Sequence, residues 1–288
     1  MASVLHQLLD NSPVILDGAW GTQLQSRGLL PGQCPDAWNL THPDDVVAVA
    51  TGYVDAGSMV ILTNTFGANR ITLSRWGLDA RAREINRLGV ELSKRATGGK
   101  AFVFASIGPS GAMLLSGDVS EDDLRVAFTE QAEALSSAGA DALVVETMSD
   151  PKEAVIAVAA GRQTGLPVIA CMSFDSGKLR DRTMMGTTPE EAARELEGAG
   201  ASVIGANCGQ GIAGYLTLCG RLRSATLLPI WLKPNAGSPE LVEGRAVYRE
   251  TPGDFAACIP PLVKAGAQFV GGCCGTSPEF ILAIREAL

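Results

Sequence analysis

Short apolar runs rich in β-branched residues alternate with longer amphipathic stretches from residue 14 to the C-terminus. Such runs, ending in glycine, asparagine or another small polar residue, are typical of buried strands, and the longer stretches have the 3.6-residue period of helices. The expected strands are Val14–Asp17, Met59–Asn64, Phe102–Ile107, Ala142–Glu146, Val168–Phe174, Val203–Asn207, Ile230–Lys233 and Phe269–Gly272. The expected helices are Pro43–Asp55, Ala80–Ala96, Ser120–Ala138, Pro151–Gln163, Thr188–Ala199, Gly214–Ala225, Pro252–Ala265 and Ser277–Leu288.

A short repeat supports this division, because the same Ala-Gly helix exit precedes every second expected strand. It occurs at Ala56-Gly57, Ala138-Gly139, Ala199-Gly200 and Ala265-Gly266. Each glycine suits the left-handed position that ends a helix. Eight strand-then-helix units in such pairs predict a single-domain α/β protein, a (β/α)8 TIM barrel over residues 1–288. An open doubly wound sheet is the alternative, although no G-x-G-x-x-G turn follows the first strand.

Composition narrows the class of protein. Of the 288 residues 46% are hydrophobic, which suffices for a large core, and the net charge of −8 gives no attraction to phosphate. We therefore expect no nucleic-acid partner. No apolar run approaches the roughly 18 residues of a membrane span, and residues 1–13 do not resemble a signal peptide. We expect no membrane association and a cytoplasmic location.

The composition favours chemistry that uses sulfur, carboxylates or backbone groups. The only two histidines are His6, near the N-terminus, and His42, at an expected helix start, so histidine-based catalytic triads are close to excluded. Seven cysteines without an export signal favour reduced thiols or metal ligands over disulfides. The cysteines for which packing is the expected role are Cys171, Cys219 and Cys258, and Cys34 has no assignable partner.

The other three cysteines fall at the carboxyl ends of expected strands, where the active site of a barrel enzyme is built. Cys208 follows the sixth strand, whereas Cys273 and Cys274 follow the eighth, within glycines that let the strand break so that adjacent side chains converge. Three thiolates without a fourth cysteine match a catalytic Zn²⁺ site with one position open to substrate. A thiol that enters this position loses its proton and becomes a nucleophile. A structural zinc site is the alternative.

Several motifs carry a resemblance to a known family. They are Leu16-Asp17-Gly18-Ala19-Trp20-Gly21-Thr22, Thr63-Asn64-Thr65-Phe66, Ala206-Asn207-Cys208-Gly209, Pro234-Asn235-Ala236-Gly237 and Gly271-Gly272-Cys273-Cys274-Gly275-Thr276. The chain resembles the zinc-dependent homocysteine S-methyltransferases from about residue 13 to its C-terminus. The wording of the motifs is most similar to that in the homocysteine-binding domain of cobalamin-dependent methionine synthase. The resemblance implies a (β/α)8 barrel in which the three cysteines hold Zn²⁺ and the sulfur of homocysteine completes the metal's coordination, so that methyl transfer gives methionine.

The resemblance also implies substrate-binding residues. Asp17 and Glu146 are expected to receive the ammonium group of homocysteine, and the backbone near Gly18, Asn64 and Thr65 its carboxylate. Paired carboxylates suit a cationic amine, and small residues let an anion approach the backbone closely. A turn residue and a helix-cap acid are the alternatives for Asp17 and Glu146.

Three further features have two interpretations each. Asn235 is either a fourth zinc ligand in the absence of substrate or a turn residue. The aromatic residues Trp20, Trp38 and Trp76 either stack on a methyl-onium donor or pack in the core. The charged segment 175–182 is either a solvated loop or a contact for the donor. No catalytic residue beyond the zinc site is expected, because thiolate activation, orientation and exclusion of water account for the displacement.

The donor is the part of the reaction that the sequence does not specify. The chain ends at Leu288, directly after the eighth helix, which favours a free small donor such as S-methylmethionine over one carried on further domains. A separate methylcorrinoid protein as donor is the first alternative. A methyltransferase for a different thiol, and a non-catalytic zinc-binding partner in a methyl-transfer complex, are the others. Oligomeric state is not legible in the sequence.

Overall fold

The computed structural model describes residues 4–242 and 245–288, in which eight parallel strands form one sheet. The strands are β1 (Val14–Ile15), β2 (Val60–Ile61), β3 (Phe102–Ile107), β4 (Ala142–Met148), β5 (Val168–Met172), β6 (Val203–Gly211), β7 (Ile230–Asn235) and β10 (Ala267–Val270). Their spatial order is β1-β10-β7-β6-β5-β4-β3-β2, and a parallel bridge between Leu16 and Val60 joins the two ends. The sheet is therefore closed, and the predicted TIM barrel is confirmed.

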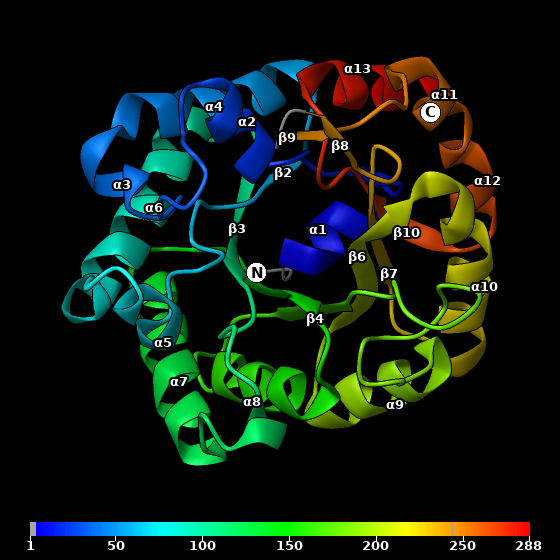
Figure 1. The fold of residues 1–288 in the computed structure, drawn as a ribbon. Coiled ribbons are helices and arrows are strands. Elements are labelled where there is room, and N and C mark those ends of the chain that lie inside the picture. Colours follow the sequence, from blue (N-terminus) through cyan, green and yellow to red (C-terminus); the bar gives the residue numbers. More distant parts are fainter. Residues whose placement is uncertain (1–3, 243–244) are drawn as a thin grey trace.

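Helices surround the barrel on its outer side (Figure 1). They are α4 (Pro43–Ala56), α6 (Ala82–Thr97), α7 (Glu121–Ser137), α8 (Pro151–Arg162), α9 (Pro189–Ala199), α10 (Tyr215–Ala225), α11 (Pro252–Ala257), α12 (Ile259–Lys264) and α13 (Pro278–Ala287). The single helix predicted over Pro252–Ala265 is wrong, because the chain breaks at Cys258 into α11 and α12. Pro260 and Pro261 have no N–H group for the helical hydrogen bonds that would bridge this point.

The Ala-Gly exits have the backbone geometry that their sequence predicts. Gly57, Gly139, Gly200 and Gly266 have φ angles of 108°, 91°, 95° and 109°, in the left-handed region that glycine adopts without strain. The next strand follows within a few residues of each glycine. The repeat seen in the sequence therefore reflects four equivalent turns from helix to strand.

Shorter elements decorate the barrel, and the sequence did not predict them. They are α1 (Val4–Leu9), α2 (Gly21–Ser26), α3 (Trp38–Thr41), α5 (Arg70–Ser74), the 3₁₀ turns η1 (Asp79–Arg81), η2 (Leu114–Ser116) and η3 (Ile212–Gly214), and the hairpin β8 (Glu240–Val242) and β9 (Arg245–Val247). Apart from α1, they all lie in segments that run from the carboxyl end of a strand toward the next barrel helix. These segments form the rim where a barrel carries its active site.

The barrel interior is apolar at the amino-terminal ends of the strands and polar at the carboxyl ends. Near the amino-terminal end of β7, Trp231 is fully buried, with its ring centroid 6.1 Å from that of Phe104 and 5.4 Å from that of Phe269. Helix α1 lies across the bore (Figure 1), and its Leu8 belongs to the same interior cluster. The next positions along the strands carry Ser106, Glu146 and other polar side chains. The reactive groups therefore gather at one end only.

Each helix in the part of the chain that the structure describes is too short or too polar to traverse a lipid bilayer.

Candidate active site

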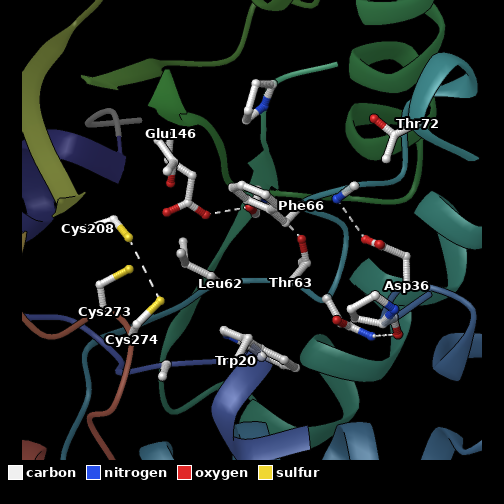
Figure 2. Close-up of a pocket in the computed structure, with 18 of the residues that line it drawn as sticks. Trp20, Asp36, Leu62, Thr63, Phe66, Thr72, Glu146, Cys208, Cys273 and Cys274 are labelled. Carbon is white, nitrogen blue, oxygen red and sulfur yellow. Dashed lines mark hydrogen bonds between the residues drawn. The ribbon is translucent and has the colours of Figure 1, made fainter. Parts of the chain in front are cut away.

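A pocket of about 490 Å³ opens at the carboxyl ends of the strands. Figure 2 shows three cysteine sulfurs and Glu146 along one side of it, with Asp36 and Thr72 on the opposite side. The aromatic side chains of Trp20 and Phe66 line the space between the two sides (Figure 2). The pocket thus has a sulfur-rich end, aromatic walls and a polar far end.

The three predicted cysteines come together at this pocket. The Sγ atoms of Cys208, Cys273 and Cys274 all lie within 4.8 Å of one another, and those of Cys208 and Cys274 are 3.8 Å apart. Zn–S bonds of about 2.3 Å in a tetrahedral site place neighbouring sulfurs about 3.8 Å apart. All seven cysteines of the chain are free. The spacing and the chemistry of the donor atoms therefore fit a zinc ion.

Cys208 reaches the cluster through an unusual backbone conformation. Its φ angle is 60°, a value uncommon outside glycine, and the register between β6 and β7 shifts after Asn207. The hydroxyl of the buried Tyr215 donates a hydrogen bond of 2.8 Å to the carbonyl oxygen of Cys208. This bond holds the bulge that turns the Cys208 sulfur toward the other two.

The adjacent cysteines converge because β10 ends at Val270, before either of them. The backbone N–H of Cys273 donates to the carbonyl of Pro234 at 2.7 Å, and the carbonyl of Cys274 accepts from Ala236 at 2.9 Å. Gly275 follows with a φ angle of 82°, and a Cβ atom there would lie 2.2 Å from the ring of Tyr248. The predicted break of the strand at the glycines is confirmed.

The cluster favours one ionised sulfur. Hydrogen bonds from Cys273 and Cys274 lower the pKa of the Cys208 thiol, whereas the hydrogen bond to Cys208 raises the pKa of Cys274. A thiolate is the form of cysteine that binds metal ions. One sulfur of the cluster is thus already a suitable metal ligand, and a cation would release the protons of the other two.

Asn235, at the end of β7, lies beside the sulfurs. Its side chain donates a hydrogen bond that contributes to the low pKa of Cys208. The side chain is buried, and its Oδ1 atom has no hydrogen-bond partner among the described residues. A buried oxygen without a partner costs free energy, which a bound cation would recover.

Glu146 lines the pocket next to the cysteines. It is 7% exposed and accepts hydrogen bonds from the hydroxyl of Ser106 and, at 3.1 Å, from Nδ2 of Asn207. Burial raises its pKa, and the charge of Lys233 partly opposes that rise. Glu146 thus presents a fixed carboxyl group to the pocket.

Asn207 is a positioning residue that the sequence analysis missed. Its amide contacts Glu146 and also bonds both the backbone N–H and the hydroxyl of Thr147, at 2.7 Å each. It further lies 3.8 Å from the sulfur of Cys273. The Asn207 side chain therefore fixes Glu146 relative to the cysteines. The position of Asn207 directly before Cys208, in the Asn-Cys motif, was the signal in the sequence that could have identified it.

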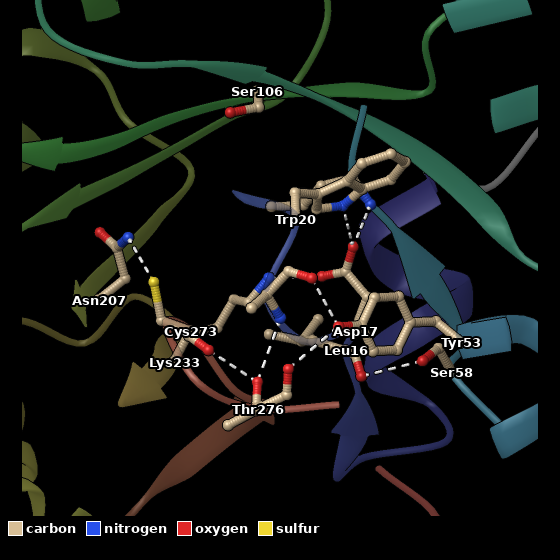
Figure 3. Close-up of polar contacts among 12 residues, drawn as sticks. Leu16, Asp17, Trp20, Tyr53, Ser58, Ser106, Asn207, Lys233, Cys273 and Thr276 are labelled. Carbon is tan, nitrogen blue, oxygen red and sulfur yellow. Dashed lines mark hydrogen bonds and ion pairs between the residues drawn. The ribbon is translucent and has the colours of Figure 1, made fainter. Parts of the chain in front are cut away.

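Asp17 is fully buried and does not line the pocket, and Figure 3 shows its polar contacts. One of its oxygens forms an ion pair with the ammonium group of Lys233. The other accepts from the backbone N–H of Leu62 at 2.8 Å and from the indole of Trp20 at 2.9 Å. Direct contact of Asp17 with a substrate ammonium stays a prediction that requires Lys233 to move aside.

The remaining predicted substrate residues lie around the same pocket. Gly18 and Asn64 line it, whereas Thr65 lies behind and donates its hydroxyl to the carbonyl of Ser106 at 2.7 Å. A Cβ atom on Gly18 would lie 2.8 Å from the side chains of Tyr53 and Thr276. Gly18 is therefore required by close packing as well as by its place at the pocket.

The aromatic residues separate into two groups. Trp20 and Trp76 line the pocket, whereas Trp38 is buried and stacks on His42 with ring centroids 4.2 Å apart. Segment 175–182 contributes nothing to the described pocket lining, and Asp181 within it pairs with Arg221. The geometry therefore agrees with a packing role for Trp38 and with a solvated loop for segment 175–182.

The fold and the site define a class: a (β/α)8-barrel enzyme whose pocket is built around clustered cysteine sulfurs. The chain belongs to the homocysteine S-methyltransferase family, whose profile matches residues 14–288. The resemblance read from its motifs is confirmed by this match.

Individual relatives agree with this assignment. The chain is 30% identical to methionine synthase from Mycobacterium tuberculosis over 304 residues, covering 99% of this chain and 25% of that protein. It thus spans about a quarter of the length of the curated relatives it matches. The metallated form of the homocysteine methyltransferase MmuM from Escherichia coli superposes with a TM-score of 0.82 at 25% identity, covering 99% of both chains. The oxidised form of MmuM gives 0.80 at 26% identity.

Proposed function

We propose that this protein transfers a methyl group to the thiol of L-homocysteine and so forms L-methionine in the cytoplasm, with Zn²⁺ as its cofactor. The convergence of three cysteine sulfurs on one pocket, in a member of this family, is the observation that carries the proposal. MmuM, similar along its whole length, is named as a homocysteine methyltransferase. A second relative, methionine synthase, is named for methionine, the product of the proposed reaction.

Cys208, Cys273 and Cys274 would hold the ion, and Asn235 offers a fourth ligand when no substrate is bound. When bound, Zn²⁺ supplies the positive charge that keeps an entering thiol ionised at neutral pH. Tyr215 maintains the backbone of Cys208 in the conformation that the site needs.

The chain's own residues orient the amino acid. Glu146 accepts hydrogen bonds from the substrate ammonium, since it is the predicted acid that faces the pocket. Asp17 would reach the substrate ammonium only if Lys233 moved aside; in the structure it holds the ammonium group of Lys233 instead. Backbone groups at Gly18 and Asn64 border the space left for the carboxylate, and Thr65 supports this wall from behind.

The reaction is an in-line displacement. The thiolate of homocysteine donates an electron pair to the methyl carbon, the new S–C bond forms as the bond from carbon to the donor atom breaks, and that electron pair stays on the donor atom. Such a step depends on alignment and on exclusion of water rather than on a general base. Trp20, Phe66 and Trp76 supply aromatic walls at this point.

A small methyl-onium compound, such as S-methylmethionine, is the donor we propose. The aromatic side chains of Trp20 and Phe66, which line the pocket beside the sulfurs, suit a positively charged methyl group, because aromatic faces attract cations.

A methylcorrinoid carried by a separate protein is the second candidate donor. Exposed apolar side chains on the rim loops favour it, because such side chains mark docking surfaces. They include Phe66, Met113, Leu115, Leu179 and Met184, of which Leu115 is 81% exposed.

A donor panel assayed on one purified, metal-analysed sample tests the proposal. We expect methionine from homocysteine and S-methylmethionine, at a rate that rises with bound zinc. Activity only with an added methylcorrinoid protein would select the second donor. Product with another thiol instead of homocysteine would show a different substrate, and bound zinc without turnover under any condition would indicate a non-catalytic zinc-binding partner.

A further inference from the structure

Lys233 is a buried cation whose role the proposed reaction does not explain. Its side chain is 2% exposed. Among the residues whose burial is described, it is the only buried lysine or arginine. It also lines the pocket that contains the cysteines and Glu146. A buried charge is costly unless it is paired, so its position calls for a reason.

Asp17 fixes the ammonium group of Lys233 at the pocket wall. The carboxylate of Asp17 is itself immobilised by Leu62 and Trp20, so the ion pair has little freedom (Figure 3). An ammonium group has three N–H donors, and Asp17 is the one described partner of Lys233. Lys233 therefore retains donors that a ligand in the pocket can use.

Glu146 supplies the opposite charge within the same pocket. Burial acts to lower the pKa of Lys233, but the charges of Asp17 and Glu146 outweigh it and raise that pKa. Glu146 and Lys233 form no ion pair in the structure, although each affects the pKa of the other. Glu146 and Lys233 thus present opposite charges to the pocket that holds the cysteine sulfurs, without an ion pair between them.

We propose that Lys233 is a specificity-determining residue that binds the carboxylate of the thiol substrate while Glu146 binds its ammonium group. An α-amino acid carries both charges on a single carbon, which matches a separated Glu146 and Lys233. A purely structural ion pair has no need of a place on the pocket lining, whereas a carboxylate receptor does. This inference rests on the proposed function, because it takes homocysteine as the substrate.

Three thiols that differ in their charged groups distinguish binding of the carboxylate from binding of the ammonium group. L-homocysteine has both, 3-aminopropane-1-thiol lacks the carboxylate, and 4-sulfanylbutanoate lacks the ammonium group. Binding of each to the zinc-loaded protein is measured by calorimetry, independently of any donor. We expect the wild-type protein to bind homocysteine at least about tenfold more tightly than 3-aminopropane-1-thiol, because a hydrogen bond between charged groups contributes about this much to affinity. Equal affinities would overturn the proposal without any variant.

Substitution then assigns the preference to Lys233. The double variant Asp17→Asn, Lys233→Met removes both charges of the pair, so no unpaired carboxylate is left buried. We expect it to lose about tenfold or more in affinity for homocysteine and 4-sulfanylbutanoate, while 3-aminopropane-1-thiol binds as before and the zinc content is unchanged. KM for homocysteine should rise by more than kcat falls. Lys233→Arg should keep the preference for a carboxylate, and the exposed Lys100→Met is the matched control.

Equal weakening of all three thiols by the double variant, or unchanged binding of homocysteine, would show that Lys233 only balances Asp17. The binding measurement separates this inference from the proposed function. Homocysteine bound with the expected preference but never methylated by any donor would overturn the proposed function alone. Methylation without the preference would overturn this inference alone.

Discussion

At the scale of single residues, a few backbone and side-chain constraints produce the site. The left-handed conformation of Cys208, the turn at Gly275 and the amide of Asn207 bring together groups that lie on different strands. Cysteine pairs and an Asn-Cys motif made the sulfurs predictable from sequence. The Asp17–Lys233 ion pair was not, because its partners are 216 residues apart and Lys233 ends an otherwise apolar strand segment.

Replacing any one of the clustered cysteines tests the metal site. Cys208→Ser, Cys273→Ser and Cys274→Ser should each abolish bound zinc, because a neutral hydroxyl replaces a thiolate ligand. Metal content by mass spectrometry of the purified protein measures this. Cys219→Ser is the matched control, since Cys219 is buried on α10, where its sulfur lies 3.9 Å from the carbonyl oxygen of Leu262 in α12, and it is not one of the clustered cysteines. Full zinc retention in any of the three variants would exclude that residue as a ligand.

Glu146→Ala should separate substrate binding from metal binding. Loss of the carboxylate removes the proposed partner of the substrate ammonium, so affinity for homocysteine should fall by about tenfold or more. Zinc content should not change, because Glu146 is not one of the clustered ligands. Calorimetry and metal analysis on the same sample give both results, and loss of zinc would mean that Glu146 serves the metal.

Asp36 predicts a pH dependence of stability. Burial raises its pKa from 3.8 to about 6, so the folded protein holds this proton more tightly than the unfolded chain. Stability is therefore lost as the pH rises from about 4 to about 6, by up to about 3 kcal/mol. Asp36→Asn removes this loss and should be the more stable form at neutral pH. Urea unfolding across that range checks it, and parallel pH profiles for the two proteins would contradict it.

At the scale of elements, hydrophobic periodicity predicted the eight strands and the helices between them, because both faces of each unit are buried in a barrel. It failed where packing with distant segments decides the structure. Helix α1 forms because Leu8 enters the barrel interior, and the β8–β9 hairpin belongs to a rim loop without a periodic pattern. The split between α11 and α12 was readable from Pro260-Pro261 but was missed.

Leu8→Ala tests the contribution of α1 to the barrel. Leu8 is 1% exposed within the interior cluster, so its truncation leaves a cavity and should lower the free energy of unfolding by about 2–5 kcal/mol. Zinc content at low temperature should not change, because the cavity lies at the other end of the barrel. Leu227→Ala, at a side chain that is 95% exposed, should change stability by less than about 0.5 kcal/mol. Equal effects of the two substitutions would refute a role of α1 in the core.

At the scale of the whole molecule, closing the sheet creates the site. β6 and β10 are separated in the barrel only by β7, so Cys208 meets Cys273 and Cys274 although 65 and 66 residues separate them in sequence. Counting strand-then-helix units predicted this neighbourhood. The shape of the pocket, its aromatic side and its buried cation depend on loop packing, which no count of units contains.

X-ray absorption at the zinc edge tests the central claim most directly, because it counts the sulfur atoms around the metal. The account predicts three sulfur neighbours at about 2.3 Å in the protein alone and a fourth when homocysteine is added. Four sulfurs before homocysteine is added, or three both before and after, would contradict it.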